Sequence, residues 1–104
     1  MSVDRANLPE GLLDDIKDSL QITWSDTQTD NRVTNWIALG MVYINGKIGE
    51  EADYTVDSLP RTLLFEYVRY ARDGSLDVFA NNYLDLLLAA RDEVQTAAAQ
   101  EAQQ

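Results

Sequence analysis

Residues 75–94 read SLDVFANNYLDLLLAARDEV and carry the longest periodic apolar pattern in the chain. Steps of three and four residues place apolar side chains on one face of an α-helix. We therefore expect a helix that begins near Ser75 and forms the spine of the fold. Its expected buried stripe consists of Leu76, Phe79, Ala80, Tyr83, Leu84, Leu87, Leu88, Arg91 and Val94.

A shorter amphipathic pattern lies near the N-terminus. Leu12 and Ile16 have helical spacing, and the polar residues around them, including Lys17, are expected to face solvent. Proline is well tolerated at the first position of a helix because its missing N–H has no intrahelical partner there. The sequence therefore predicts a short helix from about Pro9 to Leu20.

A second helix is expected to begin near Asp26. Ser25 and Gln28 have the spacing of a capping box, in which a hydroxyl and a side-chain amide bond the free backbone groups at a helix start. Helical apolar spacing continues from there over several turns. Gly46 and Gly49 are expected to end this helix.

The sequence also indicates a close helix contact and the two ends of a third helix. Gly40 lies on the apolar stripe of the second helix, at a position where a neighbouring helix can approach closely. Ser58 is a suitable cap for the third helix, with Pro60 in its first turn. Gly74 is suited to the left-handed conformation that commonly follows a helix end.

These patterns predict an all-α protein, a small bundle of four helices with a flexible C-terminal tail. No segment alternates like a strand between hairpin turns. A length of 104 residues fits a single domain. We expect this domain to span residues 1–94, and residues 95–104 to form an Ala/Gln-rich tail without large apolar side chains to bury.

The composition excludes several classes of function. The chain has 18 Asp+Glu against 8 Lys+Arg, a formal net charge of −10, and neither His nor Cys. Imidazole bases, thiolates and the usual soft metal ligands are therefore absent. A negative chain repels nucleic-acid phosphates, so specific DNA binding is not expected. No apolar run reaches the roughly 18 residues that a membrane span needs, so no membrane contact is expected either.

Carboxylate clusters do not have the pattern of a catalytic or metal site. The acidic segment at residues 50–57 lacks the alternating ligands and central glycine of a calcium loop. Neither a P-loop, a dinucleotide-binding glycine motif nor a strand-elbow serine occurs. We therefore expect no enzyme, no cofactor and no bound metal.

Charged and aromatic residues gather on the third and fourth predicted helices. Tyrosine and arginine are the residue types that dominate protein interfaces, although they can also border a core and neutralise nearby acids. Both roles remain open at this stage. The candidate subunit interface consists of Glu66, Arg69, Tyr70, Arg72, Asp85 and Arg91.

The order of these features is similar to that of a known family. A break at Trp24-Ser25-Asp26 precedes a long helix, and an acidic loop leads to the sequences RYAR at residues 69–72 and FANNY at residues 79–83. Over residues 12–94 the chain resembles the head–tail connector (adaptor) proteins of tailed phages and prophages. These are small helical proteins.

The resemblance implies a non-enzymatic component of the virion neck. Connectors of this family form a homo-oligomeric ring, usually of twelve subunits, beneath the portal protein. The ring extends a channel through which DNA passes without specific binding, and it offers a platform to a neck or tail-completion protein. The protein would then occur in the host cytoplasm during assembly and in the virion neck afterwards. By this analogy the C-terminal part docks on the portal, with Val94, Ala97, Ala98 and Gln100 as candidate contacts.

Two other functions are compatible with the sequence. The charge of −10 also suits an acidic helical binding module, either a DNA mimic or an inhibitor of a host nucleic-acid protein. Such a module would stay monomeric or dimeric and bind a basic partner, whereas a connector closes into a ring. A carboxylate–metal enzyme is the third possibility, and a large thermal shift with Mg²⁺, Mn²⁺ or Ca²⁺ would reveal it.

Overall fold

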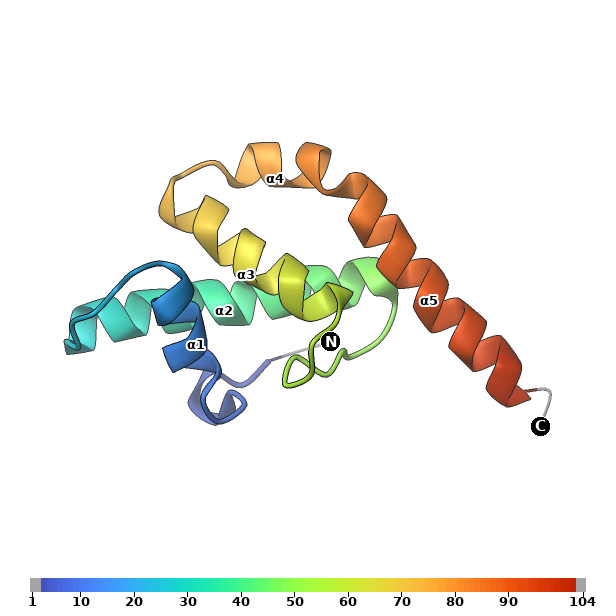
Figure 1. Ribbon diagram of the computed structural model, residues 1–104, viewed down its shortest axis with the longest axis horizontal. Coiled ribbons are helices and arrows are strands. Elements are labelled where there is room, and N and C mark those ends of the chain that lie inside the picture. Colours follow the sequence, from blue (N-terminus) through green and yellow to red (C-terminus); the bar gives the residue numbers. More distant parts are fainter. Residues whose placement is uncertain (1–2, 103–104) are drawn as a thin grey trace.

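The described chain is entirely helical in its regular elements. A computed structural model describes residues 3–102, without the side chains of residues 98 and 100–102, and contains no strand in that range (Figure 1). This confirms the predicted all-α class, but residues 3–102 contain five α-helices instead of the four that were predicted. After the 3₁₀ turn η1 (Arg5–Asn7) they are α1 (Leu12–Ser19), α2 (Thr27–Ile48), α3 (Leu59–Arg72), α4 (Leu76–Asn82) and α5 (Leu84–Ala102).

The predicted fourth helix is divided at Tyr83, which leaves helical geometry with φ −115° and ψ 13°. Asparagine is a weak helix former, and Asn81 and Asn82 directly precede the break. The bend allows the Tyr83 ring to stack on Phe79, with ring centroids 5.0 Å apart. The sequence pattern showed the apolar spacing across this point but not the bend.

The start of α1 and the capping residue of α2 differ from the predictions, whereas α2 begins beside Asp26 as expected. Gly11 has φ +81°, a left-handed conformation, so α1 begins only at Leu12 and Pro9 stays in the preceding turn. Asp26, not Ser25, caps α2, because its Oδ1 accepts a hydrogen bond from the backbone N–H of Thr29 at 2.8 Å.

The other predicted helix boundaries are largely confirmed. Gly49 ends α2 with φ +90°, whereas Gly46 lies inside the helix and does not interrupt it. Ser58 caps α3, where its Oγ accepts from the backbone N–H of Arg61 at 3.3 Å, and Pro60 lies in the first turn. Gly74 adopts φ +73° after the end of α3.

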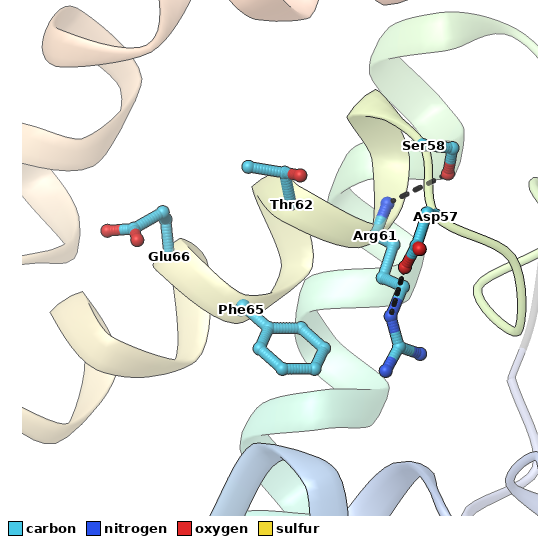
Figure 2. A pocket seen from close by; sticks show the side chains of 6 residues that line it. All are labelled: Asp57, Ser58, Arg61, Thr62, Phe65 and Glu66. Carbon is cyan, nitrogen blue, oxygen red and sulfur yellow. Dashed lines mark hydrogen bonds and ion pairs between the residues drawn. The ribbon is translucent and has the colours of Figure 1, made fainter. Parts of the chain in front are cut away.

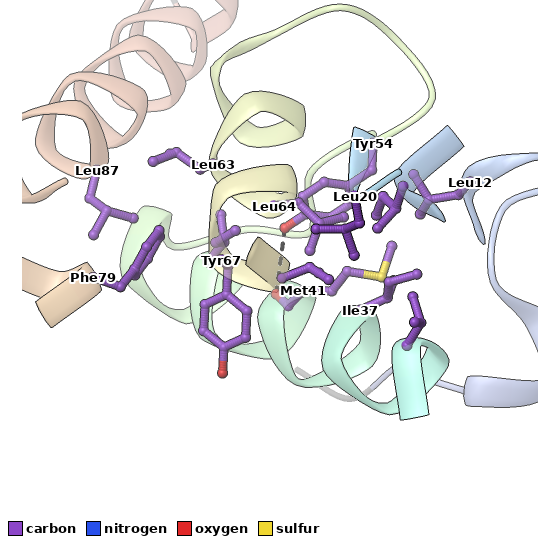
Figure 3. Close-up of a cluster of buried hydrophobic side chains, with 14 of the residues drawn as sticks. Leu12, Leu20, Ile37, Met41, Tyr54, Leu63, Leu64, Tyr67, Phe79 and Leu87 are labelled. Atoms are coloured by element: carbon purple, nitrogen blue, oxygen red, sulfur yellow. Dashed lines mark hydrogen bonds between the residues drawn. The ribbon is translucent and has the colours of Figure 1, made fainter. Parts of the chain in front are cut away.

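Helix α2 forms the centre of the fold, and α3 packs along it (Figure 1). Side chains from α1 to α5 and from the loops meet in one buried cluster (Figure 3). Removing this apolar surface from water supplies most of the stability of such a small domain. Side chains at 0% exposure are Ile16, Ile37, Ile44, Leu63, Leu64 and Val68.

A buried polar contact fixes the loop between α2 and α3. The Tyr54 hydroxyl donates a hydrogen bond to Asn45 Oδ1 at 2.7 Å, and the backbone N–H of Ala52 donates to the same oxygen at 3.1 Å. Tyr54 and Asn45 are only 2% and 4% exposed. The acidic loop is therefore attached to the core by a satisfied pair of buried polar groups.

Replacing Tyr54 with phenylalanine is expected to lower the free energy of unfolding by about 1 kcal/mol, the usual net value of one hydrogen bond. The ring is retained and Asn45 Oδ1 still accepts from Ala52, so packing should be unaffected. Urea denaturation of the two proteins measures the difference. Equal stability would show that the hydroxyl contact contributes nothing in solution.

The predicted tail does not form a separate segment in the structure. Residues 95–102 continue α5 as helix, and this end of α5 extends away from the rest of the molecule (Figure 1). Residues 103–104 lie outside the described part of the chain. The molecule is correspondingly elongated, with extents of 49 × 28 × 22 Å. Fraying of this helical end remains a prediction that hydrogen exchange would test.

Candidate subunit interface

An aromatic cluster joins α2, α3 and the α4–α5 junction, and it includes one residue of the candidate interface, Tyr70. Phe79 lies at its centre, with ring centroids 5.4 Å from Tyr67, 5.8 Å from Tyr70 and 6.0 Å from Tyr43. These three contacts have the edge-on geometry that aromatic rings prefer. The Tyr83 ring is instead stacked on the Phe79 ring, with an angle of 24° between the two planes. Tyr70, a predicted interface residue, is therefore part of the internal packing.

Hydrogen bonds form a polar rim on this cluster. The Tyr83 hydroxyl donates to Glu66 Oε2 at 3.0 Å, and Asn82 Nδ2 donates to the Tyr70 hydroxyl at 3.1 Å. Arg69 lies 3.6 Å from the same Glu66 oxygen. Glu66, Arg69 and Tyr70 are thus brought together, and Glu66 and Tyr70 hold the α4–α5 junction against α3.

Tyrosine ionisation should weaken this structure at high pH. Burial, and secondarily the hydrogen bond and charge of Glu66, raises the pKa of Tyr83 to about 12. Burial also raises the pKa of Tyr54 and of Tyr67. In the unfolded chain the tyrosine pKa values are about 10, so the unfolded chain releases these protons first as the pH rises.

The resulting stability is fully present below about pH 10 and is lost progressively as the pH rises through the folded pKa values. We expect the urea midpoint to fall from about pH 10 upward, with a smaller fall in Tyr83→Phe, whose phenyl ring cannot ionise. Urea titrations combined with tyrosinate absorbance measure both quantities. An equal fall in both proteins would exclude Tyr83 as a contributor.

Arg72 is separated from the other predicted interface residues of α3. Its Nη1 donates to the backbone carbonyl of Leu20 at 2.6 Å, directly after α1. A cation at this position satisfies a carbonyl at the helix end and complements the helix dipole. Tyr70 packs instead toward Phe79 on α4. The α3 residues therefore do not form a single surface.

The structure separates the roles of the two α3 arginines. From the sequence, replacing both Arg69 and Arg72 with Glu is expected to block assembly without loss of helix. Arg72→Glu should also destabilise the subunit by about 1–3 kcal/mol, because it leaves the Leu20 carbonyl beside a carboxylate. Arg69→Glu should cost at most about 0.5 kcal/mol, since it changes only an exposed pair.

Thermal or urea denaturation of each single variant tests this difference. Sedimentation of Arg69→Glu then tests the interface without a folding defect. A stability loss in Arg69→Glu as large as that in Arg72→Glu would contradict the separation of roles.

A cavity of about 370 Å³ lies along the first turns of α3 (Figure 2). Its only cation, Arg61, is already engaged: Nη1 donates to the Tyr54 carbonyl at 2.7 Å and Nη2 to Asp15 Oδ2 at 2.9 Å. The guanidinium also lies over the Phe65 ring, 4.8 Å from its centroid. These contacts give Arg61 a structural role. The cavity is lined by Asp57, Ser58, Arg61, Thr62, Phe65 and Glu66.

Helix α5 exposes side chains that the sequence pattern placed in the core. Leu87 and Ala90 are buried, but Leu84 is 52% exposed and Leu88 47%. Leu76 and Arg91 of the expected stripe are exposed as well. The prediction of one continuous buried stripe is therefore wrong for the outer part of α5. The leucines at positions 84, 86, 87 and 88 lie on several sides of the helix, and this was the sequence signal for an exposed contact surface.

The remaining predicted contacts lie along the same helix. Asp85 and Arg91 are exposed. Val94 is half-buried against the core and Ala97 is exposed. The side chains of Ala98 and Gln100 lie outside the described residues.

Within the described part of the chain, no three or more of the residues His, Cys, Asp and Glu are grouped so that they could hold a metal ion. Residues 3–102 contain no helix long and apolar enough to span a membrane. Comparisons with protein-family models, curated proteins and solved structures give no significant match to this chain.

Proposed function

We propose that the protein is a structural head–tail connector (neck adaptor) of a tailed phage or prophage. In this proposal the subunits form a ring beneath the portal, extend the DNA channel and present a platform for a neck or tail-completion protein. The exposed leucines of α5 are the single observation that supports this proposal most strongly. No catalytic step is assigned to the protein.

The leucines of α5 lie on two sides of the helix. Leu84 and Leu88 are four residues apart and share one side, whereas Leu86 lies on the other side of the buried Leu87. Leu86 is also exposed, at 37%. Contiguous exposed apolar surface on a small protein typically marks an interaction site. Apolar residues on both flanks suit a helix that other subunits or partner proteins cover on more than one side.

The charge of the subunit is consistent with a DNA channel. A net charge of −10 repels the phosphate backbone, so DNA can move past such a surface without being held. The resemblance described above supplies the remaining parts of the proposal: twelve subunits, assembly in the host cytoplasm and a final position in the virion neck.

The C-terminal end of α5 is proposed to dock on the portal through the region of Val94 and Ala97. We expect the full chain to co-elute with the portal protein encoded in the same genome, and a chain ending at Val94 to lose this binding. Size exclusion with light scattering measures the complex, and circular dichroism checks that the shortened subunit stays folded. Equal binding by both chains would contradict docking through this segment.

The charge of −10 also favours a second candidate function, an acidic binding module that imitates DNA or inhibits a host nucleic-acid protein. This candidate predicts a monomer or dimer that forms a salt-sensitive complex with a basic host protein and none with the portal. The two functions therefore differ in the partner that is captured and in the size of the assembly.

A further inference from the structure

A groove with unusual chemistry lies where the loop between α1 and α2, the first turns of α2 and the end of α3 meet. Its cavity measures about 220 Å³ and contains Trp24, Trp36, Arg32 and Arg72. No carboxylate lines it, although the chain has 18 acidic against 8 basic residues. The full lining, called here the Trp–Arg groove, is Ile22, Trp24, Thr29, Arg32, Val33, Trp36 and Arg72.

Trp24 and Arg32 are the side chains of this groove that are most available for contact. Trp24 is 52% exposed and its Nε1 donates to Thr29 Oγ1 at 3.3 Å, which holds the indole beside α2. Arg32 is exposed and forms no ion pair with any described residue. Tryptophan and arginine are the residue types most enriched among the contacts that dominate binding energy. The groove therefore suits a partner with both apolar and acidic side chains.

Helix α5 carries a face of this complementary kind. Leu84, Leu88 and Asp92 follow one another at steps of four residues, and Asp85 lies beside them one turn before Leu88. All four are exposed, and neither aspartate forms an ion pair with a described residue. Arg91 borders this face on the side of Leu87.

The two surfaces lie toward opposite ends of the molecule. The Trp–Arg groove is at the end where α2 begins, and α5 extends from the other end of the long, 49 Å axis (Figure 1). A subunit cannot fill its own groove in this arrangement, but a second copy can.

We infer that the Trp–Arg groove of one subunit receives the Leu84–Leu88–Asp92 face of α5 from the next subunit. The contact is heterologous, because different surfaces of the two copies meet, and repetition of such a contact gives a closed ring or a filament. The apolar parts exclude water, while Asp85 and Asp92 approach Arg32 and Arg72. This inference rests on the proposed connector function for its ring, but the contact itself can be tested separately.

Intrinsic fluorescence reports directly on this groove, because the chain has two tryptophans, Trp24 and Trp36, and both line it. A concentration series of the full chain, with and without the portal, is followed by sedimentation velocity and tryptophan emission. We expect association to shift the emission to shorter wavelength and to reduce quenching by acrylamide. Assembly with unchanged emission and quenching would overturn the inference.

Two single substitutions test the surfaces separately. Arg32→Glu reverses the charge of the groove, and Leu88→Asp disrupts the α5 face; both positions are exposed, so folding should be retained. Each variant alone is expected to associate at least ~10-fold more weakly than the unaltered protein. Leu39→Asp is the matched control, since Leu39 is 58% exposed on α2 and outside both surfaces, and it should assemble normally.

Mixing the two variants gives the sharpest test. Leu88→Asp keeps an intact groove and Arg32→Glu keeps an intact α5 face, so an equimolar mixture should form a one-to-one dimer and no larger ring. Adding Asp92→Arg to Arg32→Glu should partly restore self-association. Failure of the mixture to dimerise, while the unaltered protein assembles, would overturn the inference.

The outcomes for the contact and for the connector function are distinct. If both variants form normal rings on the portal, the contact is wrong and the connector function stands. If the groove pairs copies as described but nothing binds the portal, the contact stands and the connector function is wrong. A protein that stays monomeric both alone and with the portal contradicts both.

Discussion

Replacing Phe79 with alanine is expected to lower the free energy of unfolding by about 3–5 kcal/mol, the usual cost of removing a buried aromatic side chain. Phe79 is 1% exposed and contacts four tyrosine rings from α2, α3 and the α4–α5 junction. Phe79 is the one buried residue of α4, so its side chain supplies most of the packing that attaches this helix, beside the hydrogen bond from Asn82 to Tyr70. A loss of this size is a large part of the free energy of unfolding of a typical domain, which is about 5–15 kcal/mol.

Val78→Ala is the matched control for Phe79→Ala. Val78 is the preceding residue of the same helix and is 42% exposed, so its truncation should change stability by no more than about 0.5 kcal/mol. Urea denaturation followed by circular dichroism measures both variants. If Phe79→Ala costs no more than its control, the aromatic cluster does not hold α4 in solution.

Replacing Gly40 with alanine is expected to destabilise the protein by about 1–3 kcal/mol, although alanine is the better helix former. A Cβ atom at this position would lie 2.8 Å from Leu64 Cδ1 and 2.8 Å from Tyr67 Cδ1. Leu64 is fully buried and the Tyr67 ring is held by the aromatic cluster, so neither can move away freely. Glycine at this position allows α2 and α3 to approach closely.

Gly46 provides a control in the same helix. A Cβ atom there would meet no atom within 4 Å, so Gly46→Ala should stabilise the protein by about 0.5–1 kcal/mol through helix propensity alone. The two alanine substitutions are therefore expected to have opposite signs. Stabilisation by both, measured by thermal or urea denaturation, would contradict the close approach of α2 and α3 at Gly40.

The helical class and the close-packing role of Gly40 could be predicted from the sequence, because both follow from the spacing of residues along one helix. The cap Ser58 was predictable for the same reason, since its signal is local. The bend at Tyr83 was not, because it depends on a ring stack with Phe79 and a hydrogen bond to Glu66 on another helix.

The candidate interface also depends on contacts between distant residues, which the sequence pattern does not reveal. Arg72 and Tyr70 are two residues apart in a charged and aromatic segment, but one contacts Leu20 and the other Phe79. Lys17, expected on the polar face of α1, is instead 6% exposed and pairs with Asp30 on α2 at 2.7 Å. Such partners come from distant parts of the chain, so composition and local spacing did not reveal them.

Helix α5 illustrates why a periodic pattern does not separate a core from an interface. Leu87 and Leu88 are adjacent and chemically identical, yet one is buried within the subunit and the other is exposed. Both would be buried in a subunit whose α5 occupies the groove of a neighbour. Under the proposed contact, the apolar pattern of α5 reflects burial between subunits as well as burial within one subunit.

The proposed connector function requires this protein to form a ring on a portal. Electron microscopy of the purified protein mixed with the portal from the same genome tests it most directly. We expect a ring of subunits that is stacked coaxially on the portal and continues its channel. Portal particles without additional density, with the protein remaining monomeric beside them, would contradict the claim.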